Sequence, residues 1–146
     1  MNYFISFLFL GLMLSCASSK VDSSSTEASE QKDYKTIAVE KYGENVSYVA
    51  SPEGRYMLCV KEIKGTAKQP RNQVKYFVFD TQESSVVREE NLGAGYVKWF
   101  NETKLETFKT PGIMKVDQTS DDIAMLYDLV SGKSMTKRQF LEAKSK

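Results

Sequence analysis

The chain has 146 residues, of which 41% are hydrophobic and 12% aromatic. This is enough apolar material for one folded domain and a linker, and it excludes a wholly disordered chain. The net charge of +1 gives no reason to expect nucleic acid or an acidic substrate as a partner, and the lack of histidine excludes histidine-based triads and imidazole metal sites.

The chain begins with a segment that is typical of an export signal. Residues 4–14 are an apolar run, long enough for the core of a signal peptide and too short to span a bilayer as a helix. Ser15 and Cys16 follow, and the chain then becomes polar. This segment resembles the lipid-attachment signal of bacterial lipoproteins, although the usual lysine or arginine is missing before the apolar run. The resemblance implies that residues 1–15 are a signal peptide and that Cys16 becomes the first mature residue and carries acyl chains.

Ala17 follows the cysteine, which resembles the lipoproteins that are sorted to the outer membrane. The resemblance therefore implies a cell-envelope protein anchored to the membrane through Cys16. Two other interpretations stay open. Ser15-Cys16-Ala17 is also an acceptable site for ordinary secretion, which would release a soluble periplasmic or secreted protein, and an unprocessed chain would keep Cys16 as a buried apolar residue.

Residues 16–33 predict a flexible tether. After the cysteine they are polar, rich in serine and of mixed charge. Their apolar content cannot offset the entropy lost on ordering them. We therefore expect one folded domain over residues 34–146, connected to Cys16 by this tether.

From Tyr34 onward the sequence predicts short strands separated by turns. Turn residues recur between the apolar segments, as in Ser51-Pro-Glu-Gly54 and Thr110-Pro-Gly112. The predicted strands cover residues 36–42, 46–51, 55–62, 73–81, 85–90, 95–100, 104–110, 113–117, 123–130 and 133–136. Because no long segment has helical periodicity, the pattern predicts an antiparallel all-β domain. The capping-box sequence Thr136-Lys-Arg-Gln139 predicts a short C-terminal helix over residues 137–143.

The domain also contains an internal repeat. Residues 48–58 align with 98–107, and residues 76–85 align with 124–133. With Ser-Pro-Glu-Gly-Arg at a turn and a strand that ends Tyr-Asp-Leu-Val-Ser-Gly-Lys, these segments resemble blades of TolB-type and WD-repeat β-propellers. The resemblance implies two blade-like meanders, over about 46–90 and 95–136. Ordinary hairpins with the same short turn motifs are the competing interpretation.

Two blades cannot close a propeller, which needs about four. The two meanders are therefore expected to pack as a sandwich, to form one curved sheet, or to complete a stack with another subunit. Residues 74–79 are apolar on both faces of their strand, which is typical of a strand covered on both sides. The N-terminal strand, the C-terminal helix or a partner is expected to provide the outer cover.

The sequence offers few groups for catalysis. Cys59 lies in an apolar run and is interpreted as a small core residue instead of a nucleophile. Residues 117–122 are acidic but lack EF-hand spacing, so a hairpin turn is expected there instead of a calcium site. Glu89–Glu90 and Glu102–Glu106 are expected at exposed strand or turn positions. We expect no catalytic residue, no metal and no cofactor, although a pair of acids brought together by the fold stays open.

Two groups of residues are weak candidates for binding. Lys64, Lys68 and Arg71 cluster near a predicted hairpin tip with Lys61 and would form a basic lobe, a solvated loop being the alternative. Trp99 and its neighbour Tyr96 could stack on a sugar or a peptide, unless the tryptophan belongs to the core.

These observations favour a membrane-anchored cell-envelope lipoprotein that acts as a non-enzymatic binding or scaffold module. Its partners would be the membrane, through the acyl chains on Cys16, and an envelope protein or glycan, but no nucleic acid. The alternatives are a secreted carboxylate-dependent hydrolase and a subunit of an oligomeric β-propeller.

Overall fold

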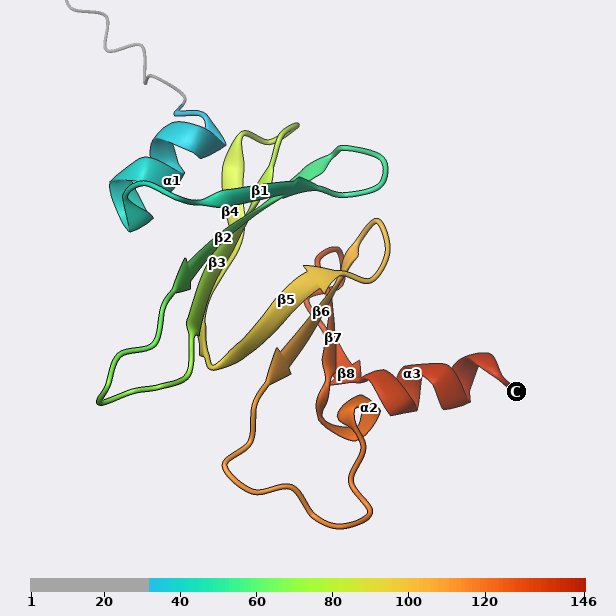
Figure 1. Cartoon of the computed structure of the whole chain (residues 1–146). Helices are drawn as coiled ribbons and strands as arrows, with labels where there is room; N and C mark the ends of the chain where they lie inside the picture. The colour runs from blue at the N-terminus through green and yellow to red at the C-terminus, as the bar shows by residue number, and fades with distance from the viewer. Residues whose placement is uncertain (1–31) are drawn as a thin grey trace, which may run out of the picture. The chain divides into compact units, whose positions relative to one another are not determined.

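The computed structural model describes residues 32–146, so the export signal, Cys16 and nearly all of the predicted tether lie outside the described residues (Figure 1). Two four-stranded antiparallel sheets form the domain, and each is a meander in which consecutive strands are neighbours. The first sheet contains β1 (Ser47–Ala50), β2 (Tyr56–Ile63), β3 (Gln73–Asp80) and β4 (Ser85–Gly93); the second contains β5 (Gly95–Trp99), β6 (Lys104–Lys109), β7 (Met125–Asp128) and β8 (Ser134–Thr136). The helices are α1 (Tyr34–Tyr42), α2 (Ser120–Ile123) and α3 (Lys137–Lys144). The predicted all-β fold with a short C-terminal helix is confirmed.

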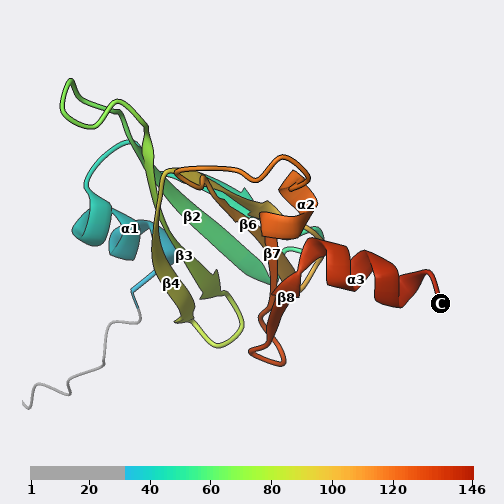
Figure 2. The ribbon, with the colours of Figure 1, turned by 90° about the horizontal axis from the view of Figure 1, so that it is seen from below.

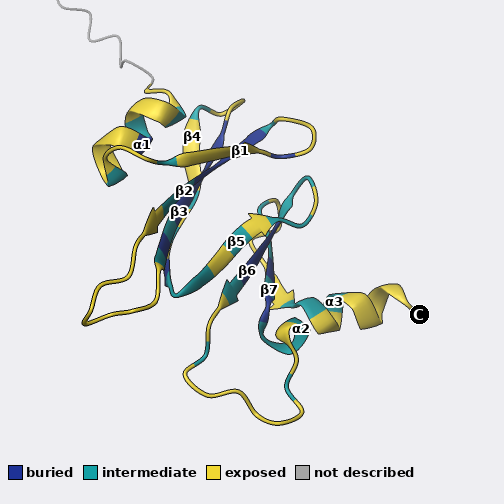
Figure 3. Cartoon of the chain, viewed as in Figure 1, coloured by how far each residue is buried: buried dark blue, intermediate teal, exposed yellow. Residues whose placement is uncertain are grey.

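The two sheets pack against each other through one face of each. On β2 and β3, alternation places Leu58 and Val78, which are partners in the strand pairing, on the face toward the second sheet. The second sheet contributes Leu105 to the same buried cluster, and Trp99 packs at its edge. The buried residues follow the central strands of both sheets (Figure 3). The two meanders therefore share one apolar core, which corresponds to the packed pair of sheets among the three arrangements that were expected.

Helix α1 covers the opposite face of the first sheet. A strand was predicted over residues 36–42, and that prediction is wrong, because these residues belong to α1. Asp33 caps the helix by accepting a hydrogen bond from the Thr36 backbone N–H at 2.7 Å. Gly43, with φ of 71°, ends it in a conformation that favours glycine. Ala38 is fully buried on the helix, against a cluster that includes Cys59 and Phe77. Burial against the sheet outweighs the strand propensity of the β-branched residues in this segment.

The connection between β6 and β7 also differs from the prediction. Residues 113–117 form a loop instead of a strand, because β6 already has β5 and β7 as its two neighbours. The expected hairpin turn over residues 117–122 contains the short helix α2, whose first turn is fixed by a hydrogen bond from the Thr119 backbone N–H to Asp122. The strand predicted over residues 123–130 is shortened to β7. Figure 2 shows α2 and α3 near β7 and β8, with α1 beside the first sheet.

The internal repeat corresponds to a structural repeat at the end of the third strand of each meander. In the first sheet, Asp80 pairs with Arg55 at 2.8 Å and accepts hydrogen bonds from the next turn. In the second sheet, Asp128 pairs with Lys104 and accepts the equivalent bonds from its own turn. The aligned positions therefore make the same contacts in both meanders. No helix formed by residues 32–146 is long and apolar enough to cross a membrane.

Candidate functional site

A hollow lined by basic, amide and aromatic side chains lies between the β2–β3 loop and the start of β5. We call it the hairpin groove. It has a volume of about 520 Å³, within the usual range for small-ligand sites. Arg71 and Asn72 line it from the loop, and Tyr96 and Phe108 line it from β5 and β6. A second hollow of about 270 Å³ shares Arg71 and adds Lys68. The fold thus brings Arg71 and Tyr96, one residue from each of the two predicted binding groups, to the same hollow, although they are far apart in the sequence.

An ordered aromatic pair forms one wall of the hairpin groove. Tyr96 and Phe108 are cross-strand partners, and their rings stack with centroids 5.3 Å apart and an interplanar angle of 11°. Gly95 lies directly before this pair, where a Cβ would come within 1.8 Å of the Phe108 carbonyl oxygen. Only glycine therefore fits this close approach of β5 to β6. Tyr96 remains 38% exposed, although Phe108 stacks on its ring and the Lys98 Nζ lies 5.3 Å from the ring centroid.

The opposite wall of the hairpin groove is cationic. Arg71 is exposed and makes no ion pair or side-chain hydrogen bond with another residue in the described part of the chain. The loop that carries it is closed by backbone hydrogen bonds between Thr66 and Gln69, at 2.7 and 3.0 Å, and by the Asn72 side chain, which accepts from the Gly65 N–H at 3.1 Å. The guanidinium is therefore free to bind a carboxylate or phosphate group.

The Glu106 carboxylate is buried next to the Tyr96 hydroxyl. Glu106 was expected at an exposed position, and that expectation is wrong. Glu106 is 2% exposed and accepts a hydrogen bond from the Tyr96 hydroxyl at 2.7 Å. The Nζ atoms of Lys98 and Lys137 lie 3.4 and 3.5 Å from its oxygens. Burial acts to raise the pKa of Glu106, but the Tyr96 hydrogen bond and the two lysine charges together lower it. Glu106 is therefore ionised at neutral pH and holds the Tyr96 ring in position.

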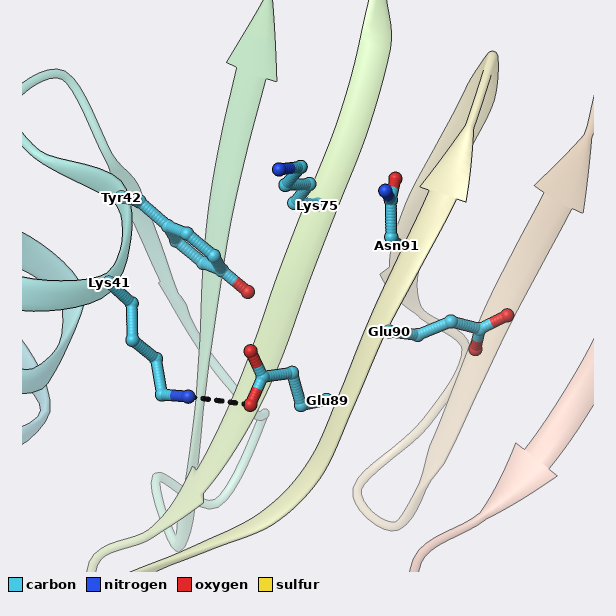
Figure 4. A pocket seen from close by; sticks show the side chains of 6 residues that line it. All are labelled: Lys41, Tyr42, Lys75, Glu89, Glu90 and Asn91. Carbon is cyan, nitrogen blue, oxygen red and sulfur yellow. Dashed lines mark hydrogen bonds and ion pairs between the residues drawn. The ribbon is translucent and has the colours of Figure 1, made fainter.

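Figure 4 shows a different hollow, away from the hairpin groove. It is a polar depression of about 370 Å³ between α1 and the first sheet. Lys41 of the helix pairs with Glu89 of β4 at 2.7 Å. Burial and the nearby Glu89 carboxylate raise the pKa of Tyr42 to about 12. Glu90 also borders the depression, but its side chain points to the other side of β4, where it pairs with Arg88 at 2.7 Å (Figure 4). The two acids therefore do not face each other.

The remaining predicted residues lie outside the hairpin groove. Trp99 is half-buried at the edge of the core, where its indole N–H donates to the Val49 carbonyl oxygen at 2.9 Å and so joins the two sheets. Its core placement is the interpretation that the structure supports. Lys64 is exposed on the β2–β3 loop but does not line the groove. Cys59 is fully buried, as predicted, and burial raises the pKa of its thiol to about 12.

The sequence did not point to two contacts that join the sheets. Arg88 of β4 lies over the Tyr127 ring of β7, 3.7 Å from its centroid. Glu102 of the β5–β6 turn accepts hydrogen bonds from the Ser51 hydroxyl, at 2.7 Å, and from the Glu53 N–H. Glu102 was expected at an exposed strand or turn position; it lies in the β5–β6 turn but is half-buried there. These contacts fix the relative position of the two sheets and therefore of the loops that border the hairpin groove.

The acidic segment 117–122 does not assemble a metal site. Asp121 pairs with Lys137 at 3.1 Å, and Asp122 pairs with Arg138. Among residues 32–146 there is no group of three or more histidine, cysteine or acidic side chains placed to hold a metal ion.

The hairpin groove is therefore the strongest candidate site, because it joins an ordered aromatic pair to a cation that has no partner in the described part of the chain. The comparisons with known proteins add no family and no relative to this assignment. The chain matches no protein-family model, no curated protein and no solved structure.

Proposed function

We propose that the protein is a cell-envelope lipoprotein, anchored by acyl chains on Cys16, whose β domain binds an acidic envelope glycan in the hairpin groove without catalysing a reaction. The anchor is supported by the N-terminal sequence. The binding function is supported by one observation above the others, the convergence of Arg71 and Tyr96 on one hollow.

The lining of the groove suggests the class of ligand. An aromatic ring held at a fixed angle gives a sugar an apolar face to pack on. The Arg71 guanidinium, together with the Asn72 side chain, would bind a carboxylate carried by that sugar. The ligand is therefore a glycan with an acidic substituent.

The structure also bears on the two alternative functions. Helix α1 occupies the face of the first sheet that a preceding blade of a shared propeller would need. In the polar depression, Glu89 and Glu90 point to opposite sides of β4 and each pairs with a cation. Both observations favour the binding module over an oligomeric propeller and over a carboxylate-dependent hydrolase.

Calorimetric titration with two matched disaccharides tests the proposal. The probes are N-acetylglucosaminyl-N-acetylmuramic acid, which carries a carboxylate, and the uncharged N,N′-diacetylchitobiose. We expect the acidic sugar to bind at least about tenfold more tightly, and Arg71→Gln to remove this preference. Tyr96→Ala should weaken both sugars, while Tyr96→Phe, which keeps the aromatic ring but loses the hydrogen bond to Glu106, should weaken them less.

Lys133→Gln is the matched control, since Lys133 lies in the β7–β8 turn, outside the groove. Circular dichroism and the melting temperature verify that each variant is folded. Absence of saturable binding, or binding that Arg71→Gln and Tyr96→Ala leave unchanged, would contradict the proposed function.

A further inference from the structure

Two loops extend from one end of the described domain and form what we call the loop end. One is the β2–β3 loop, residues 64–72, and the other is the connection after β6, residues 110–119. Both extend toward the lower part of Figure 1, and Thr110, at the start of the longer loop, lines the hairpin groove together with Arg71 and Asn72 of the shorter loop. The loop end therefore combines two distant parts of the sequence.

The longer loop exposes apolar side chains to an unusual degree. Ile113 is 90% exposed, Met114 is 48% exposed and Val116 is 102% exposed. The first and last of these are the most exposed large hydrophobic residues among the described residues. Loops are normally polar at their tips, and three exposed apolar side chains within four positions indicate a contact surface.

Lysines flank these apolar side chains in the sequence and also occur in the other loop. Lys109, the last residue of β6, and Lys115 lie on either side of Ile113, and Lys64 and Lys68 lie in the β2–β3 loop. All four are exposed, and none makes an ion pair or a side-chain hydrogen bond with another residue from 32 to 146. Asp117 is the acid within the two loops. The loop end is therefore cationic around an apolar tip.

This combination fits a lipid surface better than a protein groove. Apolar side chains that stand free of their neighbours need a surface that adapts to them, and the boundary between headgroups and acyl chains does so. The lysines around them would meet the phosphates of anionic lipids, each contributing to the attraction. The charge of the loop end is thus complementary to an anionic bilayer.

We propose that the loop end is a membrane-contact surface that inserts Ile113, Met114 and Val116 into an anionic bilayer. The contact goes beyond the proposed function, because it requires neither acyl chains on Cys16 nor a ligand in the hairpin groove. Helix α1, with which the described domain begins, lies toward the other end of the domain in Figure 1. The proposed contact is therefore at the end of the domain away from α1.

An environment-sensitive dye placed in the loop tests this contact directly. The full chain carries Cys16→Ser, and the dye is attached to the thiol of a Val116→Cys variant; Cys59 is fully buried and does not react. Vesicles of phosphatidylglycerol should shift the dye emission to the blue, whereas vesicles of phosphatidylcholine should require at least about tenfold more lipid for the same shift. Because only the dye in the loop is observed, binding of the vesicles through the N-terminal segment gives no signal.

Three comparisons make the test specific. The same dye on a Lys133→Cys variant, in the β7–β8 turn, should show no shift. Adding Ile113→Ser and Met114→Ser to the loop-labelled chain should reduce apparent vesicle affinity at least about tenfold, since the apolar area that enters the bilayer is lost. Replacing Lys64, Lys68, Lys109 and Lys115 by glutamine should remove the preference for phosphatidylglycerol, whereas Lys35→Gln with Lys133→Gln should keep it.

The proposal is overturned if the loop dye does not respond to phosphatidylglycerol, or if the control position responds equally. It is also overturned if light scattering shows that the unlabelled chain self-associates and that Ile113→Ser abolishes this, because the apolar tip would then be a protein contact. The sugar titration is independent of all these outcomes.

Discussion

Replacing Glu106 by glutamine tests whether a buried charge fixes the second sheet and the Tyr96 ring. The carboxylate side chain is 3% exposed, and a hydrogen bond to a buried charged group contributes about 1.5–3 kcal/mol. The ion pair with Lys98 adds little, since the Lys98 side chain is 57% exposed and turns easily to water. Glutamine keeps an acceptor for the Tyr96 hydroxyl, so we expect Glu106→Gln to lower the free energy of unfolding by about 1–2 kcal/mol at pH 7.

Urea unfolding followed by the fluorescence of Trp99, the one tryptophan of the chain, measures this loss. A thermal scan should show a melting temperature lower by about 3–10 °C. Glu142→Gln removes the same charge from an exposed position on α3 and should leave the stability unchanged. A Glu106→Gln variant as stable as the wild type would refute the structural role of the carboxylate.

The same substitution makes a prediction about pH. Because the pKa of Glu106 in the folded protein lies below its ordinary value of 4.5, its ionised form stabilises the fold above that pH. This contribution is lost as the pH falls through the lower folded pKa. The difference in stability between the wild type and Glu106→Gln should therefore be constant from pH 6 to 8, which lies above both values, and should shrink below about pH 4. A difference that does not depend on pH would contradict this account.

Three further predictions concern contacts within the described domain. Asp80→Asn and Asp128→Asn should each cost about 1–3 kcal/mol in urea unfolding, because each removes the charged acceptor of a turn; a large loss for one alone would contradict the structural repeat. Cys59 should resist a thiol reagent at neutral pH in the native protein and react only on unfolding, so a rapid reaction would refute its burial. Trp99→Phe should cost about 1 kcal/mol in thermal unfolding through the lost bond to Val49, and an unchanged melting temperature would show that this bond contributes nothing.

The strands of the two meanders could be predicted because their ends are set by local chemistry. Turn sequences such as Ser51-Pro-Glu-Gly54 mark the strand boundaries, and the strand next to this turn was placed to within a residue at each end. The C-terminal helix was predicted for the same reason, since Thr136 and Gln139 form the capping box that the sequence indicated. These features depend on neighbours within a few residues.

Helix α1 was missed although signals for it are present. Its β-branched residues favoured a strand, but Asp33 is a good N-cap and Gly43 a good helix end. Tyr34, Ile37 and Ala38 also follow the spacing of one helical face. Weighing the caps above the strand propensity would have given the correct result.

The contacts of the site could not be predicted in the same way. Arg71 and Tyr96 meet only because the two sheets pack at one particular angle, which no local pattern specifies. Glu106 also pairs with Lys137, which lies two strands later in the sequence, at the start of α3. Its pairing with Lys98 across β5 and β6 was in principle accessible, because the register of a predicted hairpin places opposite charges opposite each other.

The most direct test of the central claim is metabolic labelling of the expressed protein with an alkyne-bearing fatty acid. We expect the wild-type chain and a Cys59→Ala variant to carry the label and to sediment with membranes, and a Cys16→Ser variant to lose both properties. An unlabelled wild-type chain in cells that label their other lipoproteins, or a label that persists in Cys16→Ser, would contradict the lipid anchor.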